Sequence, residues 1–359
     1  MSDDCLKLTT YFGERDRTQD GLLGDQLMKV YGEHRLSASV LLRGAEGFGR
    51  LRHPRTDRLL SLSEDLPVVS IAVDRRERIE ALLPRVLQLQ RRGLITLERA
   101  RLLDGEIASS VQPPRQRGEA SKLTVYLGRQ QRIDRVPAHR VVCELLRRRG
   151  IAGASVLLGV DGTRQGRRFR AKFFGRNVDV PTLVVAVGAG QDIASVLAEL
   201  GALLGAPLVT VERVRVCKRD GVLLDAPHEL PGVDARGLAL WQKLTVYSSH
   251  DATHEGYALH LAIVRQLRES GAAGATCVRG IWGFHGDRDP HGEKVFQIRR
   301  HVPVCTIVLD APERIARSFE IIDRVTSEHG LVTSEMVPAA SAMSATEHLG
   351  GLRLADHRY

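Results

Sequence analysis

The sequence predicts an α+β protein in which one small domain occurs three times in tandem. A lysine-leucine-threonine-x-tyrosine motif starts at Lys7, Lys122 and Lys243. These starts are roughly 100 residues or more apart, which is too long for a solenoid repeat and fits a whole small domain. The chain of 359 residues has room for about three domains.

Further landmarks follow each motif in the same order, which a chance pentapeptide would not show. A glycine-rich turn comes first, at Arg43-Gly44 and Gly47, Leu158-Gly159 and Gly162, and Arg279-Gly280 and Gly283. A proline that opens an apolar stretch comes next, at Pro67, Pro181 and Pro303. A threonine-x-glutamate ending then places glutamates at Glu98, Glu212 and Glu335. We therefore expect three copies of one fold.

In the first repeat, hydrophobic periodicity predicts the main elements. Leu23, Leu27 and Tyr31 recur at the spacing of one helix face, and Asp74 can cap a second helix. The predicted order is a strand at 6–12, a helix at 22–31, strands at 39–42 and 67–73, a helix after residue 74 and a strand around residue 96. This β-α-β-β-α-β order is that of the ferredoxin-like fold.

The helices of the other two repeats show the same spacing, at 141–146, 193–200, 259–267 and 315–322. In such a unit both helices cover one face of the sheet and leave the other face bare. The third strand, such as Thr182–Val187, is nearly all apolar, which is typical of strands buried on both sides. We therefore expect three sheets packed around a pseudo-threefold axis, with the helices outside, in a chain that acts as a monomer.

Stretches of linker composition separate the repeats. Pro113-Pro114 lies in the first linker, and Pro227 and Pro231 lie in the second. The small and polar residues after Pro338 predict a loose tail. The expected domains are residues 1–103, 121–217 and 242–337, with linkers at 104–120 and 218–241 and a tail at 338–359.

Composition narrows the class of protein. Hydrophobic content of 43% is ordinary for a globular protein, and no apolar run reaches the ~18 residues that a membrane span needs. The N-terminus lacks the pattern of a signal peptide. The five cysteines form no CxxC pair, so we expect neither a disulfide framework nor a zinc site. A cytoplasmic protein without membrane insertion is expected.

The net charge of +9 and the pI near 9.6 raise the question of nucleic-acid binding. The arginines, however, are scattered over predicted helix faces, as in Arg147-Arg148-Arg149, which is typical of solvated surface. RNA-recognition domains share the βαββαβ order and place exposed aromatic residues on the third strand. Val68–Val73 and Thr182–Val187 contain no aromatic residue, so we expect no nucleic-acid partner.

The motifs resemble those of the bacterial domain of unknown function 190 family. The resemblance rests on the three lysine-leucine-threonine-x-tyrosine starts, on the turn Val278–Gly283 and on the leucine-valine-threonine-x-glutamate ending at Glu335. It covers residues 6–102, 121–217 and 242–337. The family belongs to the PII-like superfamily, whose members are usually homotrimers of one such domain. The resemblance therefore implies a PII-like pseudo-trimer within one chain.

PII proteins bind adenine nucleotides in clefts between subunits, through glycines after the second strand and a mobile loop. Glycine lets backbone N–H groups approach a phosphate, and arginine adds a bidentate partner. The resemblance thus implies a regulatory or sensing protein that binds a small anionic ligand, with an adenine nucleotide as candidate effector and no resident cofactor. Signalling would use the loops at 48–58, 163–170 and 284–297. The candidate ligand-binding residues are Arg43, Gly44, Gly47, Gly159, Gly162, Arg279, Gly280 and Gly283.

Two departures from the PII pattern leave alternatives open. The glycine-aspartate-glycine-lysine phosphate loop is missing where Arg92-Gly93-Leu94 stands, and Leu158 replaces the turn arginine of the second repeat. The glycines could therefore serve only a tight turn. One alternative function is a CutA-like protein that binds a divalent metal through residues such as His250 and His254. Another is a ligand-free scaffold that docks on a membrane channel or transporter.

Catalysis is not expected, because the sequence contains no nucleophile motif, paired-carboxylate pattern or dinucleotide fingerprint. Lys7, Lys122 and Lys243 recur, but no partner acid or base recurs at a fitting place, and lysine at a strand start is ordinary. The recurring glutamates at the ends of the repeats could pair with a lysine or arginine of a neighbouring repeat.

Fusion of the repeats allows the three clefts to differ. The second repeat has Leu158 where the others have arginine, and leucine does not replace a guanidinium that binds an anion. We therefore expect fewer than three equivalent sites, with the cleft of the second repeat's turn the weakest. The loop arginines Arg164, Arg167, Arg168 and Arg170 are expected to act mainly as steering charge.

Overall fold

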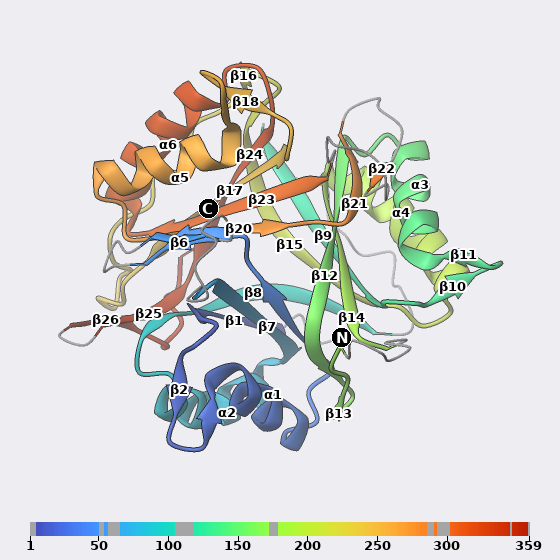
Figure 1. The fold of residues 1–359 in the computed structure, drawn as a ribbon, viewed down its shortest axis with the longest axis horizontal. Coiled ribbons are helices and arrows are strands. Elements are labelled where there is room, and N and C mark those ends of the chain that lie inside the picture. The colour runs from blue at the N-terminus through green and yellow to red at the C-terminus, as the bar shows by residue number, and fades with distance from the viewer. Residues whose placement is uncertain are drawn as a thin grey trace.

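The computed structural model describes residues 5–49, 54–56, 65–104, 118–171, 179–285, 291–292, 302–344 and 347–357. Two helices form in each repeat, and they lie where the periodicity predicts them. They are α1 (Leu23–Glu33), α2 (Arg76–Leu89), α3 (Ala138–Arg148), α4 (Gly190–Leu204), α5 (Leu259–Ser270) and α6 (Pro312–Val325). Figure 1 shows the three helix pairs at the periphery of the molecule and the long strands between them.

Each repeat contributes four main strands. They are β1 (Cys5–Gly13), β4 (Ala38–Arg43), β7 (Pro67–Arg75) and β8 (Gly93–Asp104) in the first repeat, β9 (Glu119–Gly128), β12 (Gly153–Arg164), β14 (Pro181–Gly188) and β15 (Leu208–Arg219) in the second, and β17 (Trp241–Ser249), β20 (Ala275–Arg279), β23 (Pro303–Asp310) and β24 (Leu331–Val337) in the third. The first strand of every repeat lies between the third and the fourth strand of the same repeat, in antiparallel pairing.

Shorter strands complete the sheets. They are β2 (Arg17–Thr18), β3 (Gly21–Leu22), β5 (Glu46–Phe48), β6 (Pro54–Thr56), β10 (Arg132–Ile133), β11 (Val136–Pro137), β13 (Arg167–Arg168), β16 (Val222–Leu223), β18 (Thr253–His254), β19 (Tyr257–Ala258), β21 (Trp282–His285), β22 (His291–Gly292), β25 (Ala339–Met343) and β26 (His348–Gly351). Three of the resulting hairpins, β2–β3, β10–β11 and β18–β19, stand immediately before the first helix of their repeats.

Strands also pair across the boundaries between repeats. The fourth strand β8 pairs with β15, and β15 pairs with β24. The second strand β12 pairs with β4 of the first repeat. Eight strands, in the order β4-β7-β1-β8-β15-β9-β14-β12, therefore close into a ring of antiparallel pairings. The other long strands join this ring in one 20-stranded sheet.

The predicted fold class, α+β with three tandem ferredoxin-like domains arranged as a PII-like pseudo-trimer, is therefore wrong. The described residues are mostly sheet, with 47% strand and 26% helix, and the repeats share strand pairings instead of packing as three separate sheets. The prediction failed at the strand ends. A strand was expected around Thr96, but β8 runs on to Asp104, and its extension pairs with Leu208–Val211 of the second repeat. An open strand edge can pair with any strand beside it, and the periodicity of one repeat does not identify that partner.

The C-terminal segment, expected to be a loose tail, continues the sheet. Strand β25 pairs with β8, from Ala339 opposite Leu97 to Met343 opposite Gly93, and β26 pairs with β25. The small residues of β25 fit closely against the neighbouring strand, and Ala339 and Ala340 are fully buried. Composition alone suggested a loose segment, because small and polar residues are also common in unstructured tails.

Asp74 does not cap the second helix as predicted. It lies in β7, and its carboxylate accepts hydrogen bonds from the backbone N–H groups of Ser37 (2.9 Å) and Arg75 (2.7 Å). Asp310 at the end of β23 accepts equivalent bonds from Ala273 (3.0 Å) and Ala311 (2.9 Å). In two repeats an aspartate thus ties the start of one helix to the segment before the second strand.

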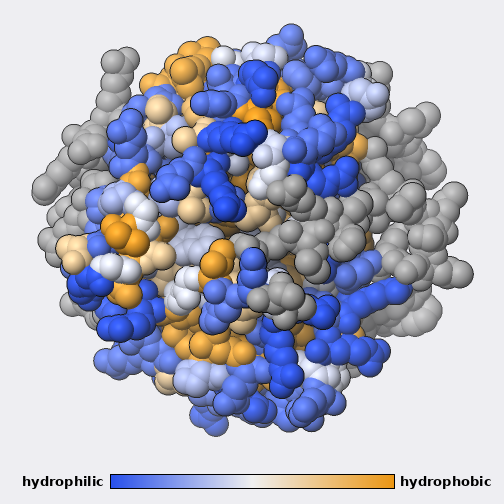
Figure 2. Space-filling model, turned by 90° about the vertical axis from the view of Figure 1, so that its left-hand side faces the viewer, coloured by the Kyte–Doolittle hydropathy of each residue, from blue (hydrophilic) through white to orange (hydrophobic). Residues whose placement is uncertain are grey.

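Hydrophobic residues from all three repeats meet in a shared cluster that includes Val69, Tyr126, Leu183 and Cys305. On the outer face seen in Figure 2, hydrophilic side chains are spread over the surface and the hydrophobic ones form separate patches between them. None of the helices in the described residues is both long enough and apolar enough to cross a membrane.

Candidate functional site

The predicted glycine-rich turns lie where the repeats meet. A Cβ atom on Gly162 would lie 2.3 Å from the carbonyl oxygen of Ser39, and one on Gly283 would lie 2.3 Å from that of Ala154. Such distances exclude a side chain, so glycine is required because a backbone of another repeat passes close by. The same holds for Gly47, where a Cβ atom would lie 2.5 Å from the carbonyl oxygen of Ala275. The structure therefore gives these glycines a structural reason that needs no ligand.

The backbone N–H groups of two turns are already used. Gly44 donates to Pro67 (2.7 Å) and Gly280 donates to Pro303 (2.7 Å). The residues that follow, Ala45 and Ile281, donate across the repeat boundary, to Cys277 and Val156 respectively. These donors are therefore occupied and do not form an open cradle for a phosphate. Gly159 has its own close neighbour, because its Cβ would lie 2.3 Å from the carbonyl oxygen of Pro181.

The two predicted arginines stand at the ends of their strands. Arg43 is half exposed and forms an ion pair with Glu14 at 2.9 Å. Arg279 is partly buried on β20. The predicted residues are thus divided among three junctions and are not gathered into one site. Much of the loops 48–58 and 284–297 lies outside the described residues.

Each junction sets the turn of one repeat against the first helix of another. Strands β12 and β13 contact α1, β21 contacts α3, and β5 contacts α5. The same turn position is occupied by Glu46, Asp161 and Trp282 in the three repeats. The chemistry of the three junctions is therefore different, although their backbone arrangement is shared.

The junction at α3 is aromatic. The Arg140 guanidinium lies 4.1 Å from the centre of the Trp282 ring, within the range of a cation–π contact. His139 meets the same ring edge-on at 6.4 Å. Burial, with help from the nearby Arg140 charge, lowers the pKa of His139 to about 4. This imidazole is therefore neutral at pH 7.

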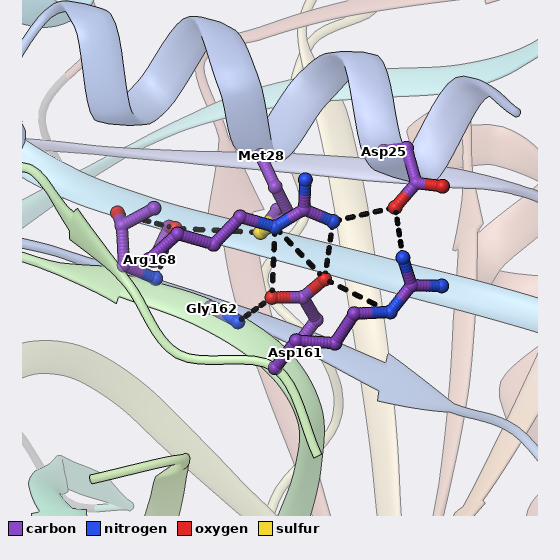
Figure 3. Close-up of polar contacts among 8 residues, drawn as sticks. Asp25, Met28, Asp161, Gly162 and Arg168 are labelled. Carbon is purple, nitrogen blue, oxygen red and sulfur yellow. Dashed lines mark hydrogen bonds and ion pairs between the residues drawn. The ribbon is translucent and has the colours of Figure 1, made fainter. Parts of the chain in front are cut away.

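The junction at α1 is ionic. The side chain of Asp161 is only 3% exposed, and both of its oxygens accept hydrogen bonds from Arg168. The Nε atom of Arg168 donates to Oδ1 at 3.2 Å and to Oδ2 at 3.1 Å, and its Nη2 atom donates to Oδ2 at 2.5 Å. Arg168 also donates to Asp25 of α1 at 2.5 Å, and Arg170 donates to the same Asp25 oxygen at 2.9 Å. Hydrogen bonding to Asp161 raises the pKa of Arg168 above its ordinary value. Figure 3 shows the guanidinium of Arg168 between Asp161 and Asp25, which lies on α1.

An open groove of about 470 Å³ accompanies this ionic cluster. It is lined by Asp25, Gln26, Met28, Lys29, Gly32, Glu33, Arg168 and Arg170. Its volume lies in the usual range of small-molecule sites. We take this groove as the candidate functional site. Arg168 and Arg170 were expected to act mainly as steering charge. Both are instead held at the groove by ion pairs with Asp25, and Arg168 also with Asp161.

The sequence pointed to these arginines but not to their partners. Asp25 lies 143 positions before Arg168, and Asp161 takes part because β12, which has a register shift between Gly159 and Asp161, contacts α1 of the first repeat. Asp25 belongs to no motif, and Asp161 stands at a position of the glycine-rich turn that differs in each repeat. Only the recurrence of arginine in the second repeat's loop could have drawn attention to this junction.

A second ionic cluster lies at the centre of the molecule. Lys7, Lys122 and Lys243 alternate with Glu98, Glu212 and Glu335 in a closed ring, and each ammonium contacts the glutamates of two repeats. The prediction that the recurring glutamates pair with a neighbouring repeat is confirmed. All six side chains are at most 10% exposed.

The ring ties the three repeats together, and its charged groups are largely shielded from solvent. Burial opposes the charge of Lys7, but the Glu212 and Glu98 carboxylates outweigh it and raise the pKa of Lys7. Burial likewise raises the pKa of Glu212, yet Lys122 and Lys7 lower it overall to about 2. The pKa of Lys122 is raised in the same way, whereas burial lowers the pKa of Lys243 below its ordinary value despite the Glu335 and Glu98 carboxylates.

His250 and His254, the candidate ligands of the metal-binding alternative, do not lie on a helix. His254 lies in the short strand β18, and His250 lies in the turn that precedes it. In the parts of the chain that the structure describes, no group of three or more histidine, cysteine, aspartate or glutamate side chains is placed to hold a metal ion. His301 lies outside the described residues. All five cysteines are buried and free.

Comparison with known proteins agrees with the internal repeat. The model of the domain of unknown function 190 family, described as "Uncharacterized ACR, COG1993", matches three times, over residues 5–102, 120–216 and 241–339. A UPF0166 protein of Aquifex aeolicus (strain VF5) is 32% identical over 94 residues, which are 26% of this chain and 88% of that relative. That relative therefore corresponds in length to about one repeat.

Proposed function

The chain belongs to the domain of unknown function 190 family, and we propose that it is a regulatory protein that binds a small anionic ligand, such as an adenine nucleotide, where two of its repeats meet. The groove between α1 and the β12–β13 hairpin carries this proposal. It combines an open volume with two guanidinium groups from one repeat and a helix from another.

The position of the groove favours regulation. Asp25 belongs to the first repeat, whereas Arg168 and Arg170 belong to the second. A ligand that binds these groups would contact both repeats, so its binding free energy would depend on how the two repeats sit together. Arg168 and Arg170 pair with Asp25 across the boundary between the repeats. A charged ligand would change these ion pairs and thereby the contact between the two repeats.

The groove also suits an anion in particular. Arginine presents a planar fork of N–H donors that matches phosphate and carboxylate. Arg168 and Arg170 converge on one carboxylate oxygen of Asp25, so they already hold the geometry in which two guanidinium groups share an anion. The turn glycines, in contrast, are explained by close backbone packing, and of them Gly162 supports this site only indirectly, through its N–H bond to Asp161.

Isothermal titration calorimetry of the intact chain tests the proposal. The panel consists of ATP, ADP, AMP, cyclic nucleotides and inorganic phosphate, with divalent metal ions added as a separate series. We expect at least one anion to bind, with an affinity that falls as the salt concentration rises. If nothing in the panel binds, the proposal fails, and a scaffold that docks on a protein partner becomes the better reading. Binding of metal ions alone would favour the metal-binding alternative.

A further inference from the structure

We propose that Asp25 is a built-in occupant of an anion site formed by Arg168 and Arg170, and that a phosphate- or carboxylate-bearing ligand binds by replacing it. This inference rests on the proposed function and makes it more specific. It predicts that removal of an acidic residue at the site strengthens binding, which is the opposite of what a supporting residue would do.

The guanidinium of Arg168 is held in place by the buried Asp161. Its Nε and Nη2 atoms donate to the buried Asp161, and Asp161 also accepts from the Gly162 N–H at 2.8 Å. Asp161 is therefore held by the backbone of β12 and is nearly inaccessible to solvent. The guanidinium is oriented before any ligand arrives, which lowers the entropic cost of binding.

Asp25 is held much less firmly. Its side chain is about one third exposed, at 32%. A single oxygen, Oδ1, accepts from both Arg168 and Arg170, and the other oxygen makes no contact with the residues drawn in Figure 3. Exposed ion pairs of this kind contribute little to stability. A ligand can therefore displace the Asp25 carboxylate into solvent without a large penalty.

Both arginines have an anionic partner before and after the exchange. Arg168 and Arg170 face Asp161 and Asp25, so two cations meet two anions. When a ligand anion takes the place of Asp25, the cations keep a partner and the freed aspartate is hydrated. A phosphate offers several acceptor oxygens and can give each guanidinium group an oxygen of its own, whereas Asp25 accepts from both through a single oxygen. A ligand phosphate is thus the stronger competitor.

The groove defines what else the ligand can carry. Gln26 and Lys29 supply polar contacts, and the fully buried Met28 lies beneath them. A volume of about 470 Å³ accommodates a small organic phosphate or carboxylate. The shared chemistry is the anionic group. Its source, free phosphate or a larger molecule that bears one, is decided by the probes below.

The test compares four variants with the wild-type chain by calorimetry with inorganic phosphate, pyrophosphate, AMP and acetate. We expect Asp25→Asn to bind the responding probe about tenfold more tightly, because the internal competitor is removed. Arg168→Gln and Arg170→Gln should weaken binding by about tenfold or more, the scale of a lost charged hydrogen bond. Arg167→Gln is the matched control, because this exposed arginine of the same hairpin lies over the Phe169 ring and is not among the groove residues. Thermal unfolding verifies that every variant is folded, and Asp25→Ser replaces Asp25→Asn if the latter is not.

The outcomes separate this inference from the proposed function. If Asp25→Asn and Asp25→Ser weaken binding as the arginine variants do, Asp25 supports the site and the inference is overturned. If a probe binds but no groove variant changes its affinity, the inference is overturned while the proposed function survives, and Arg43→Ala and Arg279→Ala then show which other junction holds the ligand. If no probe binds, both are overturned. Equal binding of phosphate and AMP would identify the phosphate group as the whole determinant and would support the inference.

Discussion

The ammonium group of Lys243 donates a hydrogen bond to the carboxylate of Glu98, which lies 145 positions earlier in the chain. The contact joins the third repeat to the first inside the buried ring of lysines and glutamates. Because each member of this ring touches two partners, the loss of one side chain leaves opposite charges buried without full compensation.

We expect Lys243→Met to destabilise the fold by about 3–5 kcal/mol, the usual cost of breaking a buried ion pair from one side. Urea unfolding measures this loss. The double variant Lys243→Met/Glu98→Leu should recover part of it, because it removes one charge of each sign. Lys29→Met is the control, since the exposed Lys29–Glu33 pair, 4.0 Å apart, should contribute about 0.5 kcal/mol or less. Equal losses for the two single variants would contradict the role of the ring.

The same ring makes stability depend on acid. Glu212 titrates at about 2 in the folded protein and at its ordinary value of 4.5 in the unfolded chain. The unfolded state therefore takes up this proton first, and the contribution of Glu212, complete above pH 4.5, is lost as the pH falls towards 2. Wild type should exceed Glu212→Gln in unfolding free energy at pH 6, and the difference should shrink on acidification. A difference that stays constant down to pH 3 would count against this assignment.

A methyl group at a junction glycine should be costly. Gly162→Ala places a Cβ against the Ser39 carbonyl, whereas a Cβ on Gly49 meets nothing within 4 Å. We expect the first substitution to destabilise the protein by about 1–3 kcal/mol, as overpacking does, and Gly49→Ala to have little effect. Denaturant midpoints compare the two. If Gly162→Ala is tolerated as well as Gly49→Ala, the close approach of the two backbones is not a constraint.

Deletion of residues 339–359 should weaken the whole molecule, because β25 then no longer pairs with β8. We expect the melting temperature to fall by about 5 °C or more, equivalent to a few kcal/mol in a protein of this size. Scanning calorimetry provides the measurement, and a deletion of residues 358–359 alone is the control. An unchanged melting temperature in the longer deletion would show that β25 contributes little.

The chain should be a monomer in solution, since the pairings that join the repeats, β8 with β15, β15 with β24 and β25 with β8, are made within one chain. Light scattering should return a mass near 39.6 kDa. A mass three times larger would mean that the repeats associate between chains.

The sequence predicted local structure better than it predicted connections between repeats. Periodicity placed α1 and β7 correctly, because burial of one face leaves its mark on every third, fourth or second residue. The repeated motifs also predicted ion pairs between repeats, such as that of Lys243 with Glu98, because both residues stand in such motifs. The pairing of β8 with β15 and the contact of Asp25 with Arg168 left no such mark. Each depends on where two distant segments meet, and neither segment carries a pattern that identifies the other.

Strand β25 has a consequence for how this protein could have evolved. Repeat proteins with open ends tolerate the gain or loss of a unit, because each new unit stacks on a free end. Here β8 pairs with β15, β15 pairs with β24, and β25, which follows β24, pairs again with β8. In the described sheet the last repeat is therefore hydrogen-bonded to the first. A fourth copy would find that edge taken, and a chain with two copies would leave it exposed. Hydrogen bonding between the ends of the array thus fixes the number of copies at three.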